Sequence, residues 1–143
     1  VLLHDCGKYI NMALSSECSY NIIMATEIIG LSHREREIVA NVVRFNSGPV
    51  LEFEELASGS TLEQADYMTI VKLTAILRVA NALDRSHKQK IKEVRVSWKD
   101  PHTMQIFVDT LEDLTLEQAL FHEKAEFFES VFSIRPVLKA KRV

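Results

Sequence analysis

The period of the hydrophobic pattern changes near residue 90, and this change most limits the folds open to the chain. Before it, apolar residues recur at helical spacing, most regularly over residues 61–86. After it, apolar and polar residues alternate in two short runs, 91–98 and 104–108. Alternation is typical of half-buried strands. The sequence therefore predicts a helical domain over residues 1–90 and a small α+β subdomain over residues 91–143.

Helix boundaries in the first part are predicted from capping residues and breakers. Ser32 and Glu35 form a capping box that should begin one helix, and Gly48-Pro49 should end it. A second capping box, Thr61-x-x-Gln64, should begin the longest helix. We expect two further helices over residues 1–13 and 17–29, and a less regular segment over residues 50–60.

The second part is predicted to be a ββαβ unit. Asp100-Pro101 separates the two alternating runs and indicates a hairpin. Thr115-x-x-Gln118 should cap a helix that runs to about Phe132, and residues 134–141 should form a closing strand. Pro136 restricts that strand to a sheet edge. We expect a core built from aromatic residues: Trp98, Phe121, Phe127, Phe128 and Phe132.

Composition excludes several classes of protein. The 143 residues are 47% hydrophobic and 26% charged, which argues against intrinsic disorder. No apolar run approaches the roughly 20 residues that a membrane span needs. Two isolated cysteines, Cys6 and Cys18, suggest reduced thiols and a cytoplasmic protein. The apolar start Val1-Leu2-Leu3, without an initiator Met, suggests a piece of a longer protein.

Charge is unevenly distributed along the chain. Residues 1–71 hold four Lys and Arg against ten Asp and Glu, whereas residues 72–143 hold thirteen against ten. The positive excess gathers in residues 78–99, where seven basic residues face only Asp84 and Glu93. Such a strip attracts polyanions, including phosphate chains. The alternative is a solvated helix end, where basic residues favour the helix dipole.

An adjacent imidazole and carboxylate, His4 and Asp5, form the first candidate for chemistry. Together they could hold a hard or borderline divalent cation. Two ligands do not complete a site, and Asp84, near the end of the longest predicted helix, is the third candidate.

Five segments of the chain, in order, resemble the C-terminal region of the exopolyphosphatase and guanosine pentaphosphatase (Ppx/GppA) family, which is similar to HD-domain proteins. The matching segments are residues 1–8, 19–23, 30–40, 43–46 and 72–87. The resemblance spans roughly residues 1–96. It implies a mainly α fold, in which an HD-domain-like helical bundle is followed by the small ββαβ unit.

The resemblance also implies a metal site that is incomplete in this chain. His4, Asp5 and Asp84 match three ligands of the HD site, for which Mg²⁺ or Mn²⁺ is the expected metal, and a further histidine would lie before the first residue. Cys18 and Asn46 stand where the family has auxiliary histidines. An amide oxygen is a poor substitute for imidazole. The alternative is that His4 and Asp5 form a buried structural pair.

In the family, phosphoanhydride hydrolysis belongs to N-terminal actin-like domains with glycine-rich phosphate loops. Here residues 58–61 lack the spacing and the Lys of such a loop. The resemblance therefore implies an accessory role without catalysis: binding of inorganic polyphosphate or guanosine pentaphosphate, dimerisation, or regulation. The candidate phosphate contacts are Arg78, Arg85, His87, Lys88, Lys90 and Lys92.

Two other functions stay open at this point. One is a metal-dependent HD-type phosphohydrolase that uses His4, Asp5 and Asp84. The other is a purely structural dimerisation domain, with an apolar groove where missing helices would pack. No motif for nucleic-acid binding occurs in the sequence, and we expect neither nucleic acid nor membrane as a partner.

Overall fold

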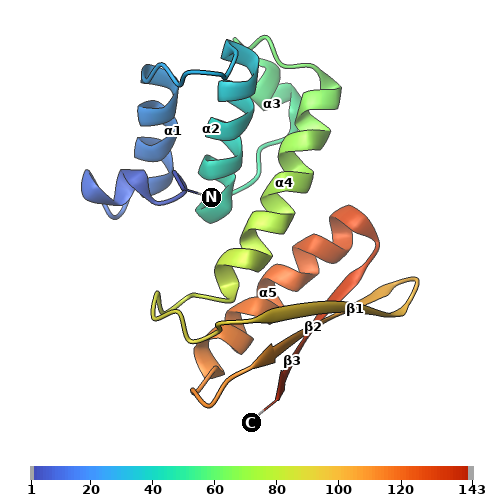
Figure 1. Cartoon of the computed structure of the whole chain (residues 1–143). Helices are drawn as coiled ribbons and strands as arrows, with labels where there is room; N and C mark the ends of the chain where they lie inside the picture. Colours follow the sequence, from blue (N-terminus) through green and yellow to red (C-terminus); the bar gives the residue numbers. More distant parts are fainter. Residues whose placement is uncertain (1, 142–143) are drawn as a thin grey trace. The chain divides into compact units, whose positions relative to one another are not determined.

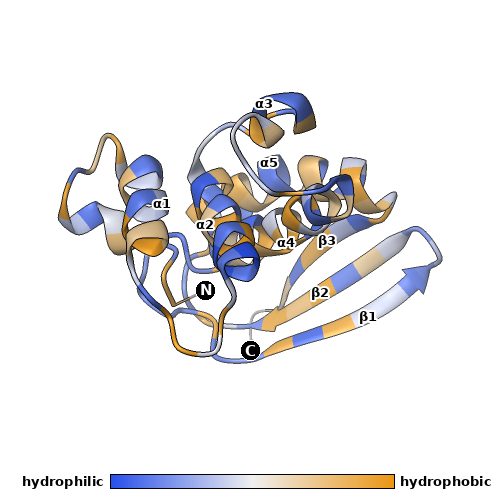
Figure 2. Cartoon of the chain, turned by 90° about the horizontal axis from the view of Figure 1, so that it is seen from above, coloured by the Kyte–Doolittle hydropathy of each residue, from blue (hydrophilic) through white to orange (hydrophobic). Residues whose placement is uncertain are grey.

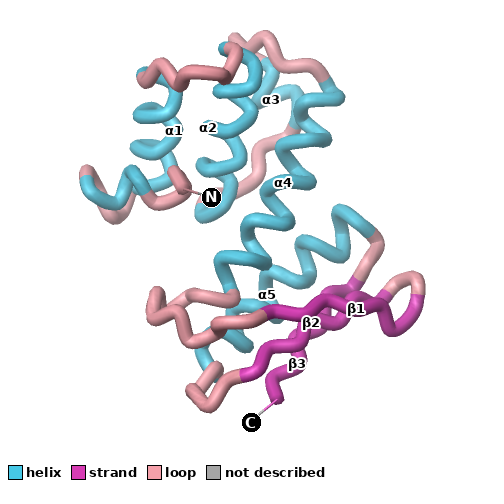
Figure 3. The backbone as a smooth tube through the Cα atoms, viewed as in Figure 1, coloured by secondary structure: helices cyan, strands magenta, loops and turns pink. Residues whose placement is uncertain are grey.

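The computed structural model describes residues 2–141, and the chain divides into two compact units, Val1–Leu77 and Arg78–Val143. The first unit contains a short 3₁₀ helix and the following α-helices (Figure 1): η1 (Cys6–Tyr9), α1 (Ser15–Ala25), α2 (His33–Ser47), α3 (Phe53–Ala57) and most of α4 (Gln64–Ala82). The second unit contains β1 (Val94–Asp100), β2 (Thr103–Asp109), α5 (Thr115–Phe132) and β3 (Arg135–Lys141). The described part of the chain is thus a mixed α/β structure, with helices followed by the predicted ββαβ order (Figure 3). The HD-like bundle and a domain boundary at residue 90 stay predictions.

Helix α2 begins at the predicted capping box. The Ser32 hydroxyl accepts the Glu35 N–H at 3.2 Å, and the Glu35 carboxylate accepts the Ser32 N–H at 2.8 Å. These reciprocal bonds satisfy two backbone donors that the helix cannot satisfy itself. The helix ends at Gly48, whose N–H donates to the Arg44 carbonyl at 3.1 Å, as the Gly48-Pro49 pair predicts.

The helix predicted over residues 1–13 is wrong, because only Cys6–Tyr9 forms a 3₁₀ turn. The reason is the position of Gly7 against the first turn of α1. Its N–H donates to the Ser19 hydroxyl at 2.8 Å, and a Cβ at this position would lie 2.1 Å from the Ser15 carbonyl oxygen. Helix α1 then ends at Ala25, four residues before the predicted boundary.

Two other predicted capping boxes do not form. Helix α4 begins at Gln64, so Thr61 lies outside it, and the Asp66 carboxylate accepts the Glu63 N–H at 2.8 Å instead. At the start of α5, the Asp113 carboxylate accepts hydrogen bonds from the Thr115 N–H and hydroxyl at 3.1 and 2.6 Å. In both places an aspartate carboxylate, and not the predicted Thr–Gln pair, accepts backbone N–H groups near the start of the helix.

The first unit is stabilised by two groups of buried side chains. One joins α2 to α3 and α4 around Phe45 and Ile70, both 0% exposed. The other joins α1 to α2 around Ile23 and Val43, against which Leu3 and Cys6 pack. Helix α2 therefore presents apolar side chains to neighbours on both of its sides. No helix within residues 2–141 combines the length and the apolar character that a membrane crossing requires.

The sheet of the second unit has the order β1-β2-β3. Strands β1 and β2 form the predicted antiparallel hairpin, with Val96 opposite Ile106, and β3 pairs with β2 in parallel. Strand β3 lies at one edge, as Pro136 predicts, and α5 packs against it. Ile106, Val108, Phe121 and Phe128 are buried in this unit.

Trp98 is not part of that core, which corrects the prediction. It lies on β1, the edge strand on the far side of the sheet from β3, and its side chain is 60% exposed. Every residue of β1 is exposed, although the strand keeps the alternating hydropathy that predicted it (Figure 2). Since α5 packs on the β3 side, the apolar residues of β1 lack the cover that alternation alone suggested.

Candidate functional site

His4 and Asp5 lie in the turn before η1 and face each other. The His4 Nε2 atom is 3.4 Å from the Asp5 Oδ2 atom, and both side chains are partly exposed. The same oxygen lies 2.7 Å from the Lys8 Nζ atom. The ammonium of Lys8 therefore already compensates the charge that a metal ion would neutralise.

Asp84 lies in the turn after α4 and shapes the loop that follows. Its Oδ1 atom accepts the Gln89 N–H at 2.9 Å, and its carbonyl accepts the His87 N–H at 3.0 Å. A metal ion on Asp84 would compete with the bond to Gln89. Among residues 2–141, no three His, Cys, Asp or Glu side chains gather as a metal-ligand group. The site predicted from His4, Asp5 and Asp84 stays a prediction.

The two residues that replace family histidines differ in their surroundings. Cys18 is a partly buried free thiol on α1. Asn46 is 5% exposed on α2, and its Oδ1 atom has no hydrogen-bond partner among the described residues. Neither side chain contributes to a metal-ligand group in the described residues.

Arg78 is anchored inside the second unit. Its guanidinium carbon lies 4.6 Å from the centre of the Phe127 ring, a cation–π contact. Burial lowers the pKa of Arg78, and the nearby Glu123 carboxylate opposes this effect. This predicted phosphate contact therefore already has an internal role, since its charge stacks on an aromatic ring.

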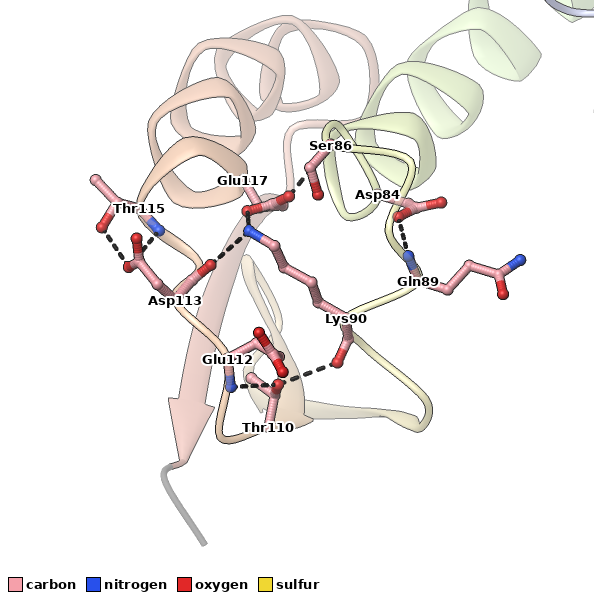
Figure 4. Close-up of polar contacts among 9 residues, drawn as sticks. All are labelled: Asp84, Ser86, Gln89, Lys90, Thr110, Glu112, Asp113, Thr115 and Glu117. Carbon is pink, nitrogen blue, oxygen red and sulfur yellow. Dashed lines mark hydrogen bonds and ion pairs between the residues drawn. The ribbon is translucent and has the colours of Figure 1, made fainter.

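Lys90 is the centre of a polar network that ties the loop after α4 to the start of α5 (Figure 4). Its Nζ atom donates to the Asp113 carbonyl at 2.6 Å and lies 3.2 Å from the Glu117 Oε2 atom. Glu117 Oε1 accepts the Ser86 N–H at 3.2 Å, and the Lys90 carbonyl accepts the Thr110 hydroxyl at 3.0 Å. Lys90 thus holds the loop in place, and its positive charge is paired with the carboxylate of Glu117.

Glu117 is fully buried, at 0% exposed. Burial by itself would raise the pKa of this carboxyl, but hydrogen bonds from Ser86 and Lys90 outweigh burial and lower the pKa below its ordinary value. The carboxylate is therefore ionised at neutral pH and holds its lysine as a charge-assisted pair.

Four other predicted phosphate contacts are exposed: Arg85, His87, Lys88 and Lys92. Among residues 2–141, the side chains of Arg85, Lys88 and Lys92 have no ion pair. The loop backbone between them is unusual, because His87 and Gln89 have φ angles of 54° and 49°. A non-glycine residue in this left-handed region is strained unless its surroundings hold it there. Asp84 and the Lys90–Glu117 pair supply that support.

The network includes a residue that sequence reasoning missed. Glu117 lies on the same face of α5 as Phe121, Ala125 and Phe128, all buried. A carboxylate at an apolar position of a helix is the available signal, because a buried charge needs a partner. The basic residues before β1 were the candidates for that partner.

Comparison with known proteins shows the family to which the chain belongs. No curated protein matches the chain at a significant level. The family model described as Ppx/GppA phosphatase, domain III, matches residues 1–125, which is most of the chain and includes the loop and the start of α5. The chain therefore belongs to the Ppx/GppA phosphatase family, as a domain III.

Proposed function

We propose that this chain is an accessory module of a Ppx/GppA-type phosphatase and binds inorganic polyphosphate at the loop between α4 and β1. The proposal depends on one observation: the basic residues of that loop differ in whether they face inward or are exposed to solvent. Lys90 points inward to the buried Glu117, while Arg85, Lys88 and Lys92 are exposed. A loop held from within presents three cations to solvent.

The geometry favours a polyanion for two reasons. Lys and Arg bind phosphate oxygens through charge-assisted hydrogen bonds, and several cations on one segment suit a chain of phosphates better than a single one. A loop already fixed by Asp84 and Glu117 also loses little conformational entropy on binding. A preorganised loop should therefore bind the polyanion more tightly than a flexible loop with the same charges.

The remaining parts of the proposal follow from the family resemblance. Hydrolysis would take place in N-terminal actin-like domains with Mg²⁺, and this chain would bind or guide the polymer for them in the cytoplasm. The first unit would then correspond to the HD-like helical bundle. Dimerisation and binding of guanosine pentaphosphate are further roles of the same module that the proposal accommodates.

Binding of fluorescently labelled polyphosphate to the whole chain tests the proposal. The variant R85Q/K88Q/K92Q should bind more weakly than wild type, and the slope of log K against log salt should fall by about 2, since each lost phosphate contact removes roughly 0.7. The matched control K72Q/K99Q/K139Q removes three exposed lysines from other elements and should lose less affinity. Equal losses in the two triple variants would reject the loop as the binding site.

The accessory role has its own test. The whole chain, incubated with polyphosphate and Mg²⁺, should release no phosphate above a heat-denatured control. Sustained release that disappears in the His4→Ala variant would contradict the accessory role and support the metal-dependent phosphohydrolase instead.

A further inference from the structure

A small polar pocket of about 150 Å³ lies within the first unit, and neither His4 nor Asp5 lines it. Its lining comes from α1, α2, α3 and the turn that follows α3. The residues that matter here are Tyr20, Glu37, Asn41, Arg44, Glu55 and Ser58. A volume of this size is enough for an ion with bound water.

Two residues that line this pocket each carry a buried oxygen atom without a hydrogen-bond donor among the described residues. Glu37 is 6% exposed and its Oε2 atom has no partner, while Asn41 is 1% exposed and its Oδ1 atom has none. The Asn41 amide nitrogen donates to the Glu37 carbonyl at 2.9 Å. Because only the NH₂ group can donate to a carbonyl, this bond fixes which way the amide faces. Both orphaned atoms are therefore acceptors, and leaving them unpaired is costly.

The charges of the residues that line the pocket favour a bound cation. Arg44 is the basic residue of the lining, but its Nε atom bonds the Glu17 carboxylate at 2.6 Å and its guanidinium carbon lies 5.3 Å from the centre of the Tyr20 ring. Among the described residues, no ion pair joins the carboxylate of Glu37 or Glu55 to this guanidinium. Burial raises the pKa of Tyr20, the negative charge of Glu37 raises it further, and the positive charge of Arg44 lowers it.

The atoms of the pocket that could bind a metal ion are all oxygen atoms. They comprise carboxylates, the Asn41 amide oxygen and serine hydroxyls, with no thiol or imidazole in the lining. Hard cations such as Ca²⁺ and Mg²⁺ prefer this set, and Ca²⁺ tolerates irregular geometry better. We propose that Glu37 and Asn41, together with the Ser58–Ser60 turn, form a binding site for a hard divalent cation. The cation would link α2 to the turn after α3.

Terbium luminescence locates the ion, since Tb³⁺ replaces Ca²⁺ at oxygen sites and a nearby phenol sensitises its emission. With the whole chain, we expect saturable Tb³⁺ emission that Ca²⁺ or Mg²⁺ displaces. Glu37→Gln keeps the shape of the side chain and removes its charge, so Tb³⁺ affinity should fall by roughly tenfold or more, the scale on which loss of metal-site partners is felt. Glu54→Gln, an exposed α3 residue outside the pocket, is the matched control and should bind as wild type.

A second readout keeps the test decisive if Glu37→Gln folds poorly. Ca²⁺ should raise the Tm of the wild type, and Tyr20→Phe should keep that rise while losing most of the Tb³⁺ emission. Absence of both saturable emission and a Ca²⁺- or Mg²⁺-dependent Tm shift would overturn the proposal and leave the pocket to water. Equal affinities of Glu37→Gln and Glu54→Gln would overturn it as well.

Discussion

The buried carboxylate of Glu117 lies 3.2 Å from the Nζ atom of Lys90, across 27 residues of sequence (Figure 4). This pair connects the loop after α4 to the first turn of α5. It also determines which basic residues of the loop remain for a partner, because the lysine that faces inward cannot serve both roles at once.

Removing the lysine should destabilise the second unit. Lys90→Met leaves Glu117 buried and charged without its ammonium, and breaking a buried pair from one side costs about 3–5 kcal/mol. Urea unfolding measures the loss. The double variant Lys90→Met/Glu117→Met should recover much of it, whereas Lys99→Met, on the exposed strand β1, should lie close to wild type. A Lys90→Met protein as stable as Lys99→Met would contradict the structural role of the pair.

The same pair predicts a dependence of stability on pH. The pKa of Glu117 in the folded state lies below its ordinary value of 4.5, because donors from Ser86 and Lys90 outweigh burial. The ionised carboxylate therefore contributes stability above pH 4.5, and this contribution is lost as the pH falls through the folded-state pKa. The difference in unfolding free energy between wild type and Glu117→Gln should shrink on acidification. A difference that stays constant between neutral and acid pH would show that the carboxylate contributes no such linkage.

Gly7 should not tolerate a side chain. In Gly7→Ala the new Cβ would lie 2.1 Å from the Ser15 carbonyl oxygen and 2.5 Å from the Ser19 nitrogen, both backbone atoms. We expect a loss of about 3 kcal/mol, the upper end of typical overpacking costs. Gly59→Ala is the comparison, since its Cβ would meet no atom within 4 Å and only the φ of 83° is unfavourable. Equal Tm values for the two variants would argue against the close approach at Gly7.

The capping box of α2 gives a smaller prediction. Ser32→Ala removes the hydroxyl that accepts the Glu35 N–H, which should cost about 1 kcal/mol in unfolding free energy. Thr61→Ala is the matched control, because the structure places Thr61 outside α4 and it should be nearly neutral. Urea unfolding of the two variants compares them directly, and a larger loss for Thr61→Ala would contradict the helix boundaries.

Local patterns predicted those parts of the fold that neighbouring residues determine. The Ser32–Glu35 box, the hairpin turn at Asp100-Pro101 and the edge position of β3 follow from residues a few positions apart. The helix over residues 1–13 was wrong because Gly7 packs against a helix that begins eight residues later. The predicted burial of Trp98 was wrong because alternation shows that a strand has an apolar face, but not how far a helix covers that face.

The candidate site was predicted only in part, for a similar reason. The sequence placed the basic residues in one strip, but it could not tell the inward Lys90 from the exposed Lys88, since that depends on a carboxylate 27 residues further along. The sequence likewise could not indicate the unpaired oxygens of Glu37 and Asn41 on α2, because their burial depends on the elements packed around that helix. Burial of a charge is a tertiary property, and its signal in sequence is only a polar residue at an apolar position.

A titration of the ¹⁵N-labelled chain with short-chain polyphosphate, followed by amide chemical shifts, shows whether polyphosphate binds at the loop between α4 and β1. We expect the largest shift changes on the amides of Arg85, Lys88 and Lys92, and we expect added salt to reverse them. Changes that are absent, or that are as large around Lys72 and Lys139 as in the loop, would contradict binding at this loop.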